Sequence, residues 1–186
     1  NCPRDSEGNA IVAKTGMGSS AALTTSLVGA LLKFFGVIQL TQNNNNNNLD
    51  IDHQRVHYLS QLIHAVAQGK IGSGFDVSAA VFGSQVYQRF SDTKIPFDEI
   101  MNPNSDGTIL YNTVENKSLW DEQVIPFNLP DGIEVMMGDV CGGSSSSSMA
   151  KAVLNWKKQD PENANIIWNR LGQTNETISR LFIELS

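Results

Sequence analysis

The chain has 186 residues, 40% of them hydrophobic, and a formal net charge of −6. This length allows the hydrophobic core of one domain, or of one domain and part of a second. The negative charge argues against nucleic acid or an anionic membrane as the main partner, because neither is attracted to an acidic surface. A phosphorylated ligand would therefore have to be held by local groups.

The cysteines, the apolar segments and the chain ends give information about the cellular location of the protein. Cys2 and Cys141 are far apart and form neither a disulfide framework nor a metal-ligand cluster, which is typical of reduced thiols in a cytosolic-type protein. The longest apolar run, residues 27–38, is too short and too interrupted to span a bilayer. The chain begins with Asn1, so we expect a piece of a longer protein. A cytoplasmic location is expected, and a peroxisomal one stays open because targeting signals would lie at the missing ends.

The stretch from Lys14 to Thr25, K-T-G-M-G-S-S-A-A-L-T-T, is the first informative one. Gly16 and Gly18 let the backbone approach a ligand closely. Ser19 and Ser20 then open a helix, whose unpaired N–H groups and positive end favour an anion such as phosphate. The Ser20 hydroxyl also offers an oxygen to Mg²⁺ on a nucleotide. The same residues equally suit a helix cap and a tight turn.

The next predicted elements are two helices separated by a polar run. Residues 20–35 predict a helix buried on most of its circumference. Its apolar side chains recur at helical spacing: Leu23, Leu27, Leu31 and Phe34. Six asparagines within 41–49 predict a disordered surface loop, because a polar homopolymer buries too little apolar surface to become ordered. Asp50 or Asp52 is expected to cap a second helix that ends at Gly69.

Three histidines share one side of this second helix. His53, His57 and His64 fall within about 40° of one another at 100° per residue. That spacing permits a metal site. Half-exposed histidines beside an apolar face are the ordinary alternative, and no Cys or Glu completes a ligand set.

The remainder of the chain predicts mixed α and β structure. Strand-like segments are expected at 86–90, 124–127 and 133–137. A helical segment follows at 149–158, and Asp160-Pro161-Glu162 predicts the N-cap of a last helix.

The second informative stretch runs from Gln68 to Ser84, Q-G-K-I-G-S-G-F-D-V-S-A-A-V-F-G-S. Gly72 and Gly74 bracket Ser73, and Asp76 follows among small and apolar residues. Asp76 is the best candidate for a catalytic carboxylate. Its position suits a helix cap as well, and the two roles are compatible.

Two lysines and a Ser-rich segment complete the candidate anion sites. Lys14 and Lys70 lie beside glycine-rich turns, where they would neutralise phosphate charge or remain solvated surface lysines, and Lys14 is the better candidate. Residues 142–148, G-G-S-S-S-S-S, follow a predicted strand and precede a helix. By composition they form either a flexible linker or a second anion site.

These strings resemble motifs of the GHMP kinases. G-M-G-S-S-A-A is similar to their second motif, roughly P-x-x-x-G-[LM]-[GS]-S-S-A, with Val12 at the proline position. Ser73 to Asp76 keeps the S-G-x-D core of their G-x-P-S-G-x-D motif, with Gly72 in place of the proline. With the Ser-rich loop, the three strings resemble the phosphomevalonate kinase branch, of the eukaryotic type, across nearly the whole chain.

The chain also departs from the family pattern. The N-terminal P-G-K-type motif and the C-terminal G-A-G-G-x-D motif, which complete the family's active site, are both absent. Ala65 stands where mevalonate kinase has a Mg²⁺-binding Glu, and Gln68 is the substitute we consider.

The resemblance implies an α+β GHMP kinase fold. Residues 1–130 would be a truncated N-terminal, ATP-binding domain resembling ribosomal protein S5 domain 2, and residues 131–186 the start of a ferredoxin-like domain. It further implies transfer of phosphate from ATP, with Mg²⁺, to 5-phosphomevalonate in isoprenoid synthesis. Another GHMP small-molecule kinase, such as a mevalonate or homoserine kinase, or a non-catalytic nucleotide-binding protein of this fold, is the alternative.

The resemblance also assigns roles to the matching positions. It makes Asp76 and Lys14 catalytic and gives Ser20 a metal contact. The nucleotide-binding positions are Gly16, Met17, Gly18, Ser19, Ser20 and Ala21. The acceptor-binding positions are Lys70, Ser73, Gly74, Gly143, Ser145, Ser146 and Ser147. The expected partners are the small-molecule acceptor and ATP, with no nucleic acid and no membrane.

Overall fold

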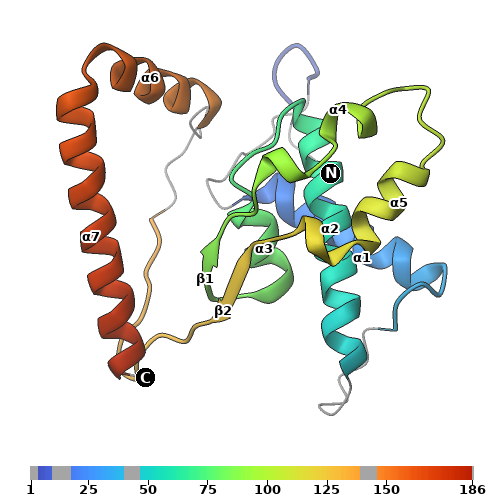
Figure 1. Ribbon diagram of the computed structural model, residues 1–186, viewed down its shortest axis with the longest axis horizontal. Helices are drawn as coiled ribbons and strands as arrows, with labels where there is room; N and C mark the ends of the chain where they lie inside the picture. Colours follow the sequence, from blue (N-terminus) through green and yellow to red (C-terminus); the bar gives the residue numbers. More distant parts are fainter. Residues whose placement is uncertain (1–3, 10–17, 40–46, 139–145, 186) are drawn as a thin grey trace. The chain divides into compact units, whose positions relative to one another are not determined.

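A computed structural model shows the chain as two compact units, Ser20–Phe127 and a second made of Asn1–Ser19 with Asn128–Ser186. The structure describes residues 4–9, 18–39, 47–138 and 146–185 (Figure 1). Helices and strands both occur, so the chain is mixed α and β as predicted. Within these described ranges, the helices are all too short or too polar to cross a membrane.

Three helices form the frame of the first unit: α1 (Ser19–Phe34), α2 (Asn47–Gln68) and α3 (Phe75–Phe82). Each ends at a glycine with positive φ, which lets the chain reverse where another residue would be strained. After α1, for example, Gly36 has φ 71° and donates its N–H to the Lys33 carbonyl at 3.1 Å. The two helices predicted before Gly36 and Gly69 are thus confirmed, and glycines with positive φ mark the ends of all three.

The prediction that α1 is buried on most of its circumference is wrong for this structure. Its large apolar stripe is exposed: Leu23 by 70%, Leu27 by 56%, Leu31 by 47% and Phe34 by 81%. The buried side is instead the one with smaller side chains, Ala21, Thr25 and Val28. On this side Gly29 comes close to α2, since a Cβ at Gly29 would lie 3.9 Å from Val56 Cγ1. Small residues let two helices approach, and periodicity alone does not show which face does so.

The start of α2 also differs from the prediction. The helix begins at Asn47, so the end of the Asn-rich 41–49 segment is helical, and residues 41–46 lie outside the described part of the chain. Neither predicted aspartate is the N-cap. Asp52 lies inside the helix, where its carboxylate accepts the Gln39 N–H at 2.8 Å and joins α2 to the segment after α1.

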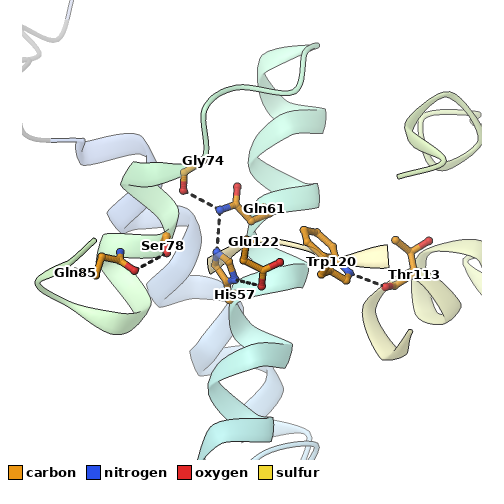
Figure 2. Close-up of polar contacts among 8 residues, drawn as sticks. All are labelled: His57, Gln61, Gly74, Ser78, Gln85, Thr113, Trp120 and Glu122. Atoms are coloured by element: carbon orange, nitrogen blue, oxygen red, sulfur yellow. Dashed lines mark hydrogen bonds and ion pairs between the residues drawn. The ribbon is translucent and has the colours of Figure 1, made fainter. Parts of the chain in front are cut away.

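An aromatic cluster forms the core beside α2. The Tyr58 and Trp120 rings stack with centroids 4.3 Å apart, and Phe90 meets Trp120 edge-on at 4.9 Å. The Trp120 indole N–H donates to the Thr113 carbonyl at 2.9 Å, so its polar end is satisfied (Figure 2). Leu62 and Ile95 complete the buried set. Side chains of this size each stabilise the fold by about 1.5 to 3 kcal/mol when buried.

Two short strands pack against α3 (Figure 1). Strand β1 (Gln85–Gln88) pairs antiparallel with β2 (Gln123–Pro126), with Val86 opposite Ile125. Both agree with strand predictions to within two residues. The prediction of a strand at 133–137 is wrong, because these residues are exposed and form no strand. A β-branched run needs a neighbouring strand to complete its hydrogen bonds, and none in the described residues supplies one.

The connection between β1 and β2 is more helical than predicted. It contains α4 (Phe97–Ile100) and α5 (Thr108–Glu115), with 3₁₀ turns η1 (Asp92–Lys94) and η2 (Lys117–Leu119). The α5 helix is joined to α2 by Arg55, whose guanidinium contacts both Glu115 carboxylate oxygens, at 2.9 and 3.0 Å.

The second unit contains α6 (Ser146–Gln159) and α7 (Pro161–Leu185). Asp160 caps α7, as predicted: its carboxylate accepts the Asn163 backbone N–H at 3.3 Å and the Asn163 side-chain amide at 2.8 Å. Trp156 and Trp168 stack across the two helices, with centroids 5.9 Å apart. Because α6 begins at Ser146, the last three residues of the predicted 142–148 loop are helical.

Candidate active site

The first candidate loop ends at Ser20, in the first turn of α1. Gly18 precedes the helix with φ 67°, and Ser19 and Ser20 are exposed while Ala21 is fully buried. The buried alanine anchors the turn and leaves the two serines accessible to a ligand. The nearby N–H groups of the first turn have no partners within the helix, as at every helix start.

The Ser20 hydroxyl is held from α2. Its Oγ lies 3.2 Å from Nε2 of His64, and Nε2 of Gln68 lies 2.9 Å from the same ring nitrogen. An amide N–H can only donate, so Nε2 of His64 is the acceptor, and the Ser20 hydroxyl shares it at the longer distance. Donating its proton to His64 leaves the Ser20 oxygen lone pairs for a ligand.

The second candidate loop ends at Gly74, the N-cap of α3. Gly74 has φ 74° and is buried against Gln61, whose side-chain amide donates to the Gly74 carbonyl at 2.8 Å. Asp76 lies in the first turn of α3, half-buried, and its carboxylate accepts the N–H of Val77 at 3.0 Å. Asp76 is therefore not the N-cap, but its negative charge sits at the favourable end of the helix dipole.

Behind Gln61 is a fully buried histidine. Nε2 of His57 lies 2.9 Å from the Gln61 amide nitrogen, and its Nδ1 lies 3.8 Å from Oε1 of Glu122 (Figure 2). Burial lowers the pKa of His57 from 6.5 to about 4, so the ring is neutral at pH 7. Burial also raises the pKa of Glu122 above its usual value. The charged form of either group is disfavoured there.

The other predicted site residues fall in three places. Lys70 and Ser73 are exposed on the segment between α2 and α3. Ser146 and Ser147 are the first two residues of α6. The remaining predicted positions lie outside the described residues: Lys14, Gly16, Met17, Gly143 and Ser145.

The structure brings the two candidate loops to one helix. Ser20 contacts His64 and Gly74 contacts Gln61, and these partners are three residues apart on α2. The two loops are therefore anchored on adjacent turns of the same helix. Of the described side chains, no group of three or more His, Cys, Asp or Glu could hold a metal ion.

Sequence reasoning missed Gln61 and Glu122, and for His57 and His64 it considered a metal site or a half-exposed position beside an apolar face. A signal was present for the α2 residues. Polar side chains at positions 57, 61, 64 and 68 recur at helical spacing within a mostly apolar stretch. The sequence offered no comparable signal for Glu122, which reaches His57 from 65 positions away.

A family comparison covers both loops. The model for the GHMP kinases N terminal domain matches residues 8–84. These residues form a GHMP kinase N-terminal domain. The match includes Ser20, Gly74, Asp76 and the whole of α2, so the Ser20–His64 and Gly74–Gln61 contacts lie within the matched residues, whereas Glu122 lies outside them.

Curated relatives extend the likeness beyond the GHMP domain. The peroxisomal phosphomevalonate kinase of Arabidopsis thaliana is 40% identical over 187 aligned positions, 94% of this chain and 35% of the relative. A phosphomevalonate kinase of Gibberella zeae is 39% identical over 89% of this chain and 37% of its own length. The corresponding values for that of Candida albicans are 37%, 88% and 36%.

The predicted resemblance to phosphomevalonate kinases is confirmed by these relatives. The chain spans about a third of the length of the curated relatives it matches. No solved structure matches the chain.

Proposed function

We propose that the protein containing this chain transfers the γ-phosphoryl group of ATP to 5-phosphomevalonate and forms 5-diphosphomevalonate. The observation that carries the proposal is the attachment of both GHMP loops to adjacent turns of α2, through Ser20–His64 and Gly74–Gln61. Phosphoryl transfer requires the donor phosphates and the acceptor to meet. The names of the matched relatives support the choice of acceptor.

The loop before α1 is the proposed site for the ATP phosphates. The N–H groups of Gly18, Ser19 and Ser20 would bind phosphate oxygens at the positive end of the helix. Lys14, Gly16, Met17 and Ala21 complete this proposed site.

Magnesium fits this site as an ion held mainly by the nucleotide. Mg²⁺ takes oxygen ligands and is usually bound by one or two protein groups together with substrate phosphates and water. Ser20 supplies one such oxygen, because its proton is directed to His64. When bound, the ion would neutralise charge on the transferred group.

Asp76, together with Lys70 and Ser73, is proposed to face the acceptor. The reaction breaks the bond between the γ-phosphorus and the bridging oxygen of ATP and forms one to a phosphate oxygen of the acceptor. That oxygen is already largely ionised at neutral pH, so no proton has to be removed. We therefore assign Asp76 mainly to orienting the acceptor and the metal rather than to general-base catalysis.

The Ser-rich segment is proposed to bind the phosphate already present on the acceptor. Gly143 and Ser145 precede α6 in the sequence, Ser146 and Ser147 are its first two residues, and Lys151 follows within that helix. An acidic protein needs local donors to hold a dianion, and hydroxyl groups and a helix start supply them. Mevalonate lacks that phosphate and would leave these donors unpaired, so it should be disfavoured.

We also propose how the chain divides into domains and where the protein is located. Residues 1–130 would be the S5-like, ATP-binding part and residues 131–186 the start of a ferredoxin-like domain. A cytoplasmic location is proposed. A peroxisomal one is the alternative, since one relative is named as peroxisomal.

The test compares kcat/KM for mevalonate and 5-phosphomevalonate in the full protein. The same comparison is made after Ser145, Ser146 and Ser147 are changed to Ala, and separately after Asp76→Asn. We expect strong preference for the phosphorylated acceptor, a loss of that preference in the serine variant, and a kcat loss much larger than any KM change in Asp76→Asn. Equal use of both acceptors by the unmodified protein would favour another GHMP kinase, and no turnover of either would favour a non-catalytic protein.

A further inference from the structure

A chain of polar contacts runs through the interior from Glu122 to Gly74. The Gln61 amide nitrogen lies 2.8 Å from the Gly74 carbonyl oxygen and 2.9 Å from Nε2 of His57 (Figure 2). The carbonyl can only accept, so the amide must present its NH₂ group there, and its second N–H is left for His57. Nε2 of His57 therefore accepts, and the proton of the neutral ring is on Nδ1, on the side of Glu122.

These contacts fix the orientation of Gln61 completely. Both of its N–H groups are used, one by His57 and one by Gly74, and the residue is buried. Rotating the amide would place its oxygen against the Gly74 carbonyl oxygen and the His57 acceptor nitrogen. The arrangement thus has a single low-energy state, unlike a surface glutamine with alternative water partners.

The backbone at Gly74 lies in close contact with the Gln61 side-chain amide. Gly74 has φ 74°, and a Cβ at this position would lie 2.6 Å from Oε1 of Gln61 and 2.8 Å from its Nε2. A Cβ here would displace the Gln61 amide, and a side chain is strained at this φ, so glycine lets the carbonyl reach Gln61 while the chain turns into α3. The far part of α3 is fixed as well, because the hydroxyl of buried Ser78 donates to Oε1 of Gln85 at 3.0 Å.

We propose that Gln61, oriented by His57, is a positioning residue that fixes the Gly74 carbonyl and with it the first turn of α3, where Asp76 lies. This inference rests on the proposed function, in which Asp76 faces the acceptor. Gln61 holds the turn two residues before the carboxylate, so its loss lets that turn shift and moves Asp76 relative to the acceptor. A misplacement of about 1 Å at a reacting centre lowers rates by up to about a hundredfold.

The Ser20 side of the site should be unaffected by Gln61. Ser20 contacts His64, and His64 is contacted in turn by Gln68; among the described residues, neither His64 nor Gln68 has a side-chain hydrogen bond to Gln61. A defect confined to Gly74 and Asp76 should therefore lower kcat and leave Mg·ATP binding intact. Merely structural damage would instead reduce the amount of folded protein and both properties together.

The experiment uses the full protein and the variant Gln61→Leu, which keeps the volume and removes both N–H donors. Gln61→Met serves as a second variant, because this unbranched side chain of similar length has no donor for Gly74. Gln88→Ala, at an exposed glutamine on β1, is the matched control. Mg·ATP affinity is measured by calorimetry without the acceptor, and kcat is expressed per mole of Mg·ATP sites.

We expect kcat to fall on the order of tenfold to a hundredfold in both Gln61 variants, with Mg·ATP affinity within about twofold of the unmodified protein. The Gln88 control should match the unmodified protein in both measurements. An unchanged kcat per site in both Gln61 variants would overturn the inference, even if their melting temperatures fall. Absence of phosphomevalonate turnover in the unmodified protein would instead reject the proposed function.

A double-variant cycle tests whether Gln61 acts through Gly74. Gly74→Ala inserts a methyl group against the Gln61 amide and should break the same hydrogen bond. If the two residues act as one unit, Gly74→Ala lowers kcat by a factor similar to that of Gln61→Leu, and the double variant is little worse than either. Multiplying effects would show independent roles and would also overturn the inference.

Discussion

Replacing His57 by Gln should change how the stability of the folded protein depends on pH. His57 is fully buried, and burial lowers its pKa from 6.5 to about 4. The Gln side chain cannot titrate, yet its carbonyl oxygen can still accept the Gln61 N–H that His57 accepts now. The substitution therefore removes the titration while keeping an acceptor for Gln61.

The size and sign of the effect follow from the two pKa values. Between pH 6.5 and 4, His57 is protonated in the unfolded state but stays neutral in the folded state. Stability from neutral His57 is therefore present above pH 6.5 and is lost as the pH falls toward 4. A pKa difference of this size corresponds to about 3 kcal/mol. The unfolding free energy of the unmodified protein should fall by that amount relative to the variant between pH 7 and pH 4.

Glu122 acts in the opposite direction, because burial raises its pKa. Its contribution to stability is greatest at low pH and is lost as the pH rises through its folded pKa. The carboxylate is present in both proteins, so the difference between the two stability curves isolates His57 to first order.

The assay is urea unfolding followed by tryptophan fluorescence at pH 7, 6, 5 and 4. Trp120 stacks on Tyr58, next to His57 on α2, and it is the one tryptophan of the Ser20–Phe127 unit. Changing Trp156 and Trp168 to Phe in both proteins leaves Trp120 as the sole tryptophan of this 186-residue stretch. A difference between the two proteins that stays constant from pH 7 to pH 4 would refute a buried, neutral His57.

Three further predictions concern single side chains. Ser20→Ala should raise KM for Mg·ATP by about tenfold with little change in melting temperature, because the serine is exposed; an unchanged KM would remove it from the nucleotide site. Asp160→Ala should cost about 1 kcal/mol of α7 stability, read from helix melting by circular dichroism, and no loss would mean that the cap adds nothing. Arg55→Ala should lower the free energy of unfolding by about 0.2 to 1 kcal/mol in low salt and by less in high salt, since Arg55 and Glu115 are about one-third exposed. A loss that does not depend on salt would indicate lost packing rather than a lost ion pair.

The sequence by itself determined the local features of this protein. The glycines and serines before α1, the S-G-x-D turn before α3 and the Asp160 cap of α7 are each set by neighbouring residues in the chain. The backbone freedom of glycine and the hydrogen bonds of a capping carboxylate act over a few residues. These motifs were also enough to identify the GHMP domain, whose family model matches residues 8–84.

The burial of α1 was decided only by tertiary structure. Helical spacing correctly marked Leu23 and Phe34 as one stripe, but the side that packs is the one with small residues around Ala21 and Thr25. A periodic pattern identifies a face of a helix and not the surface that covers it. The failed strand at 133–137 has the same cause, since strand residues need a partner that sequence alone does not supply.

The buried contacts of the candidate site likewise could not be predicted from the sequence. Glu122 meets His57 because folding brings the residue before β2 to α2, and Gln61 meets Gly74 because α3 packs beside α2. Whether a histidine is neutral or charged depends on how many polar groups and how much water surround it after folding. His57 became a buried hydrogen-bond acceptor, rather than a metal ligand, because packing removed its solvent and placed an amide donor against its ring nitrogen.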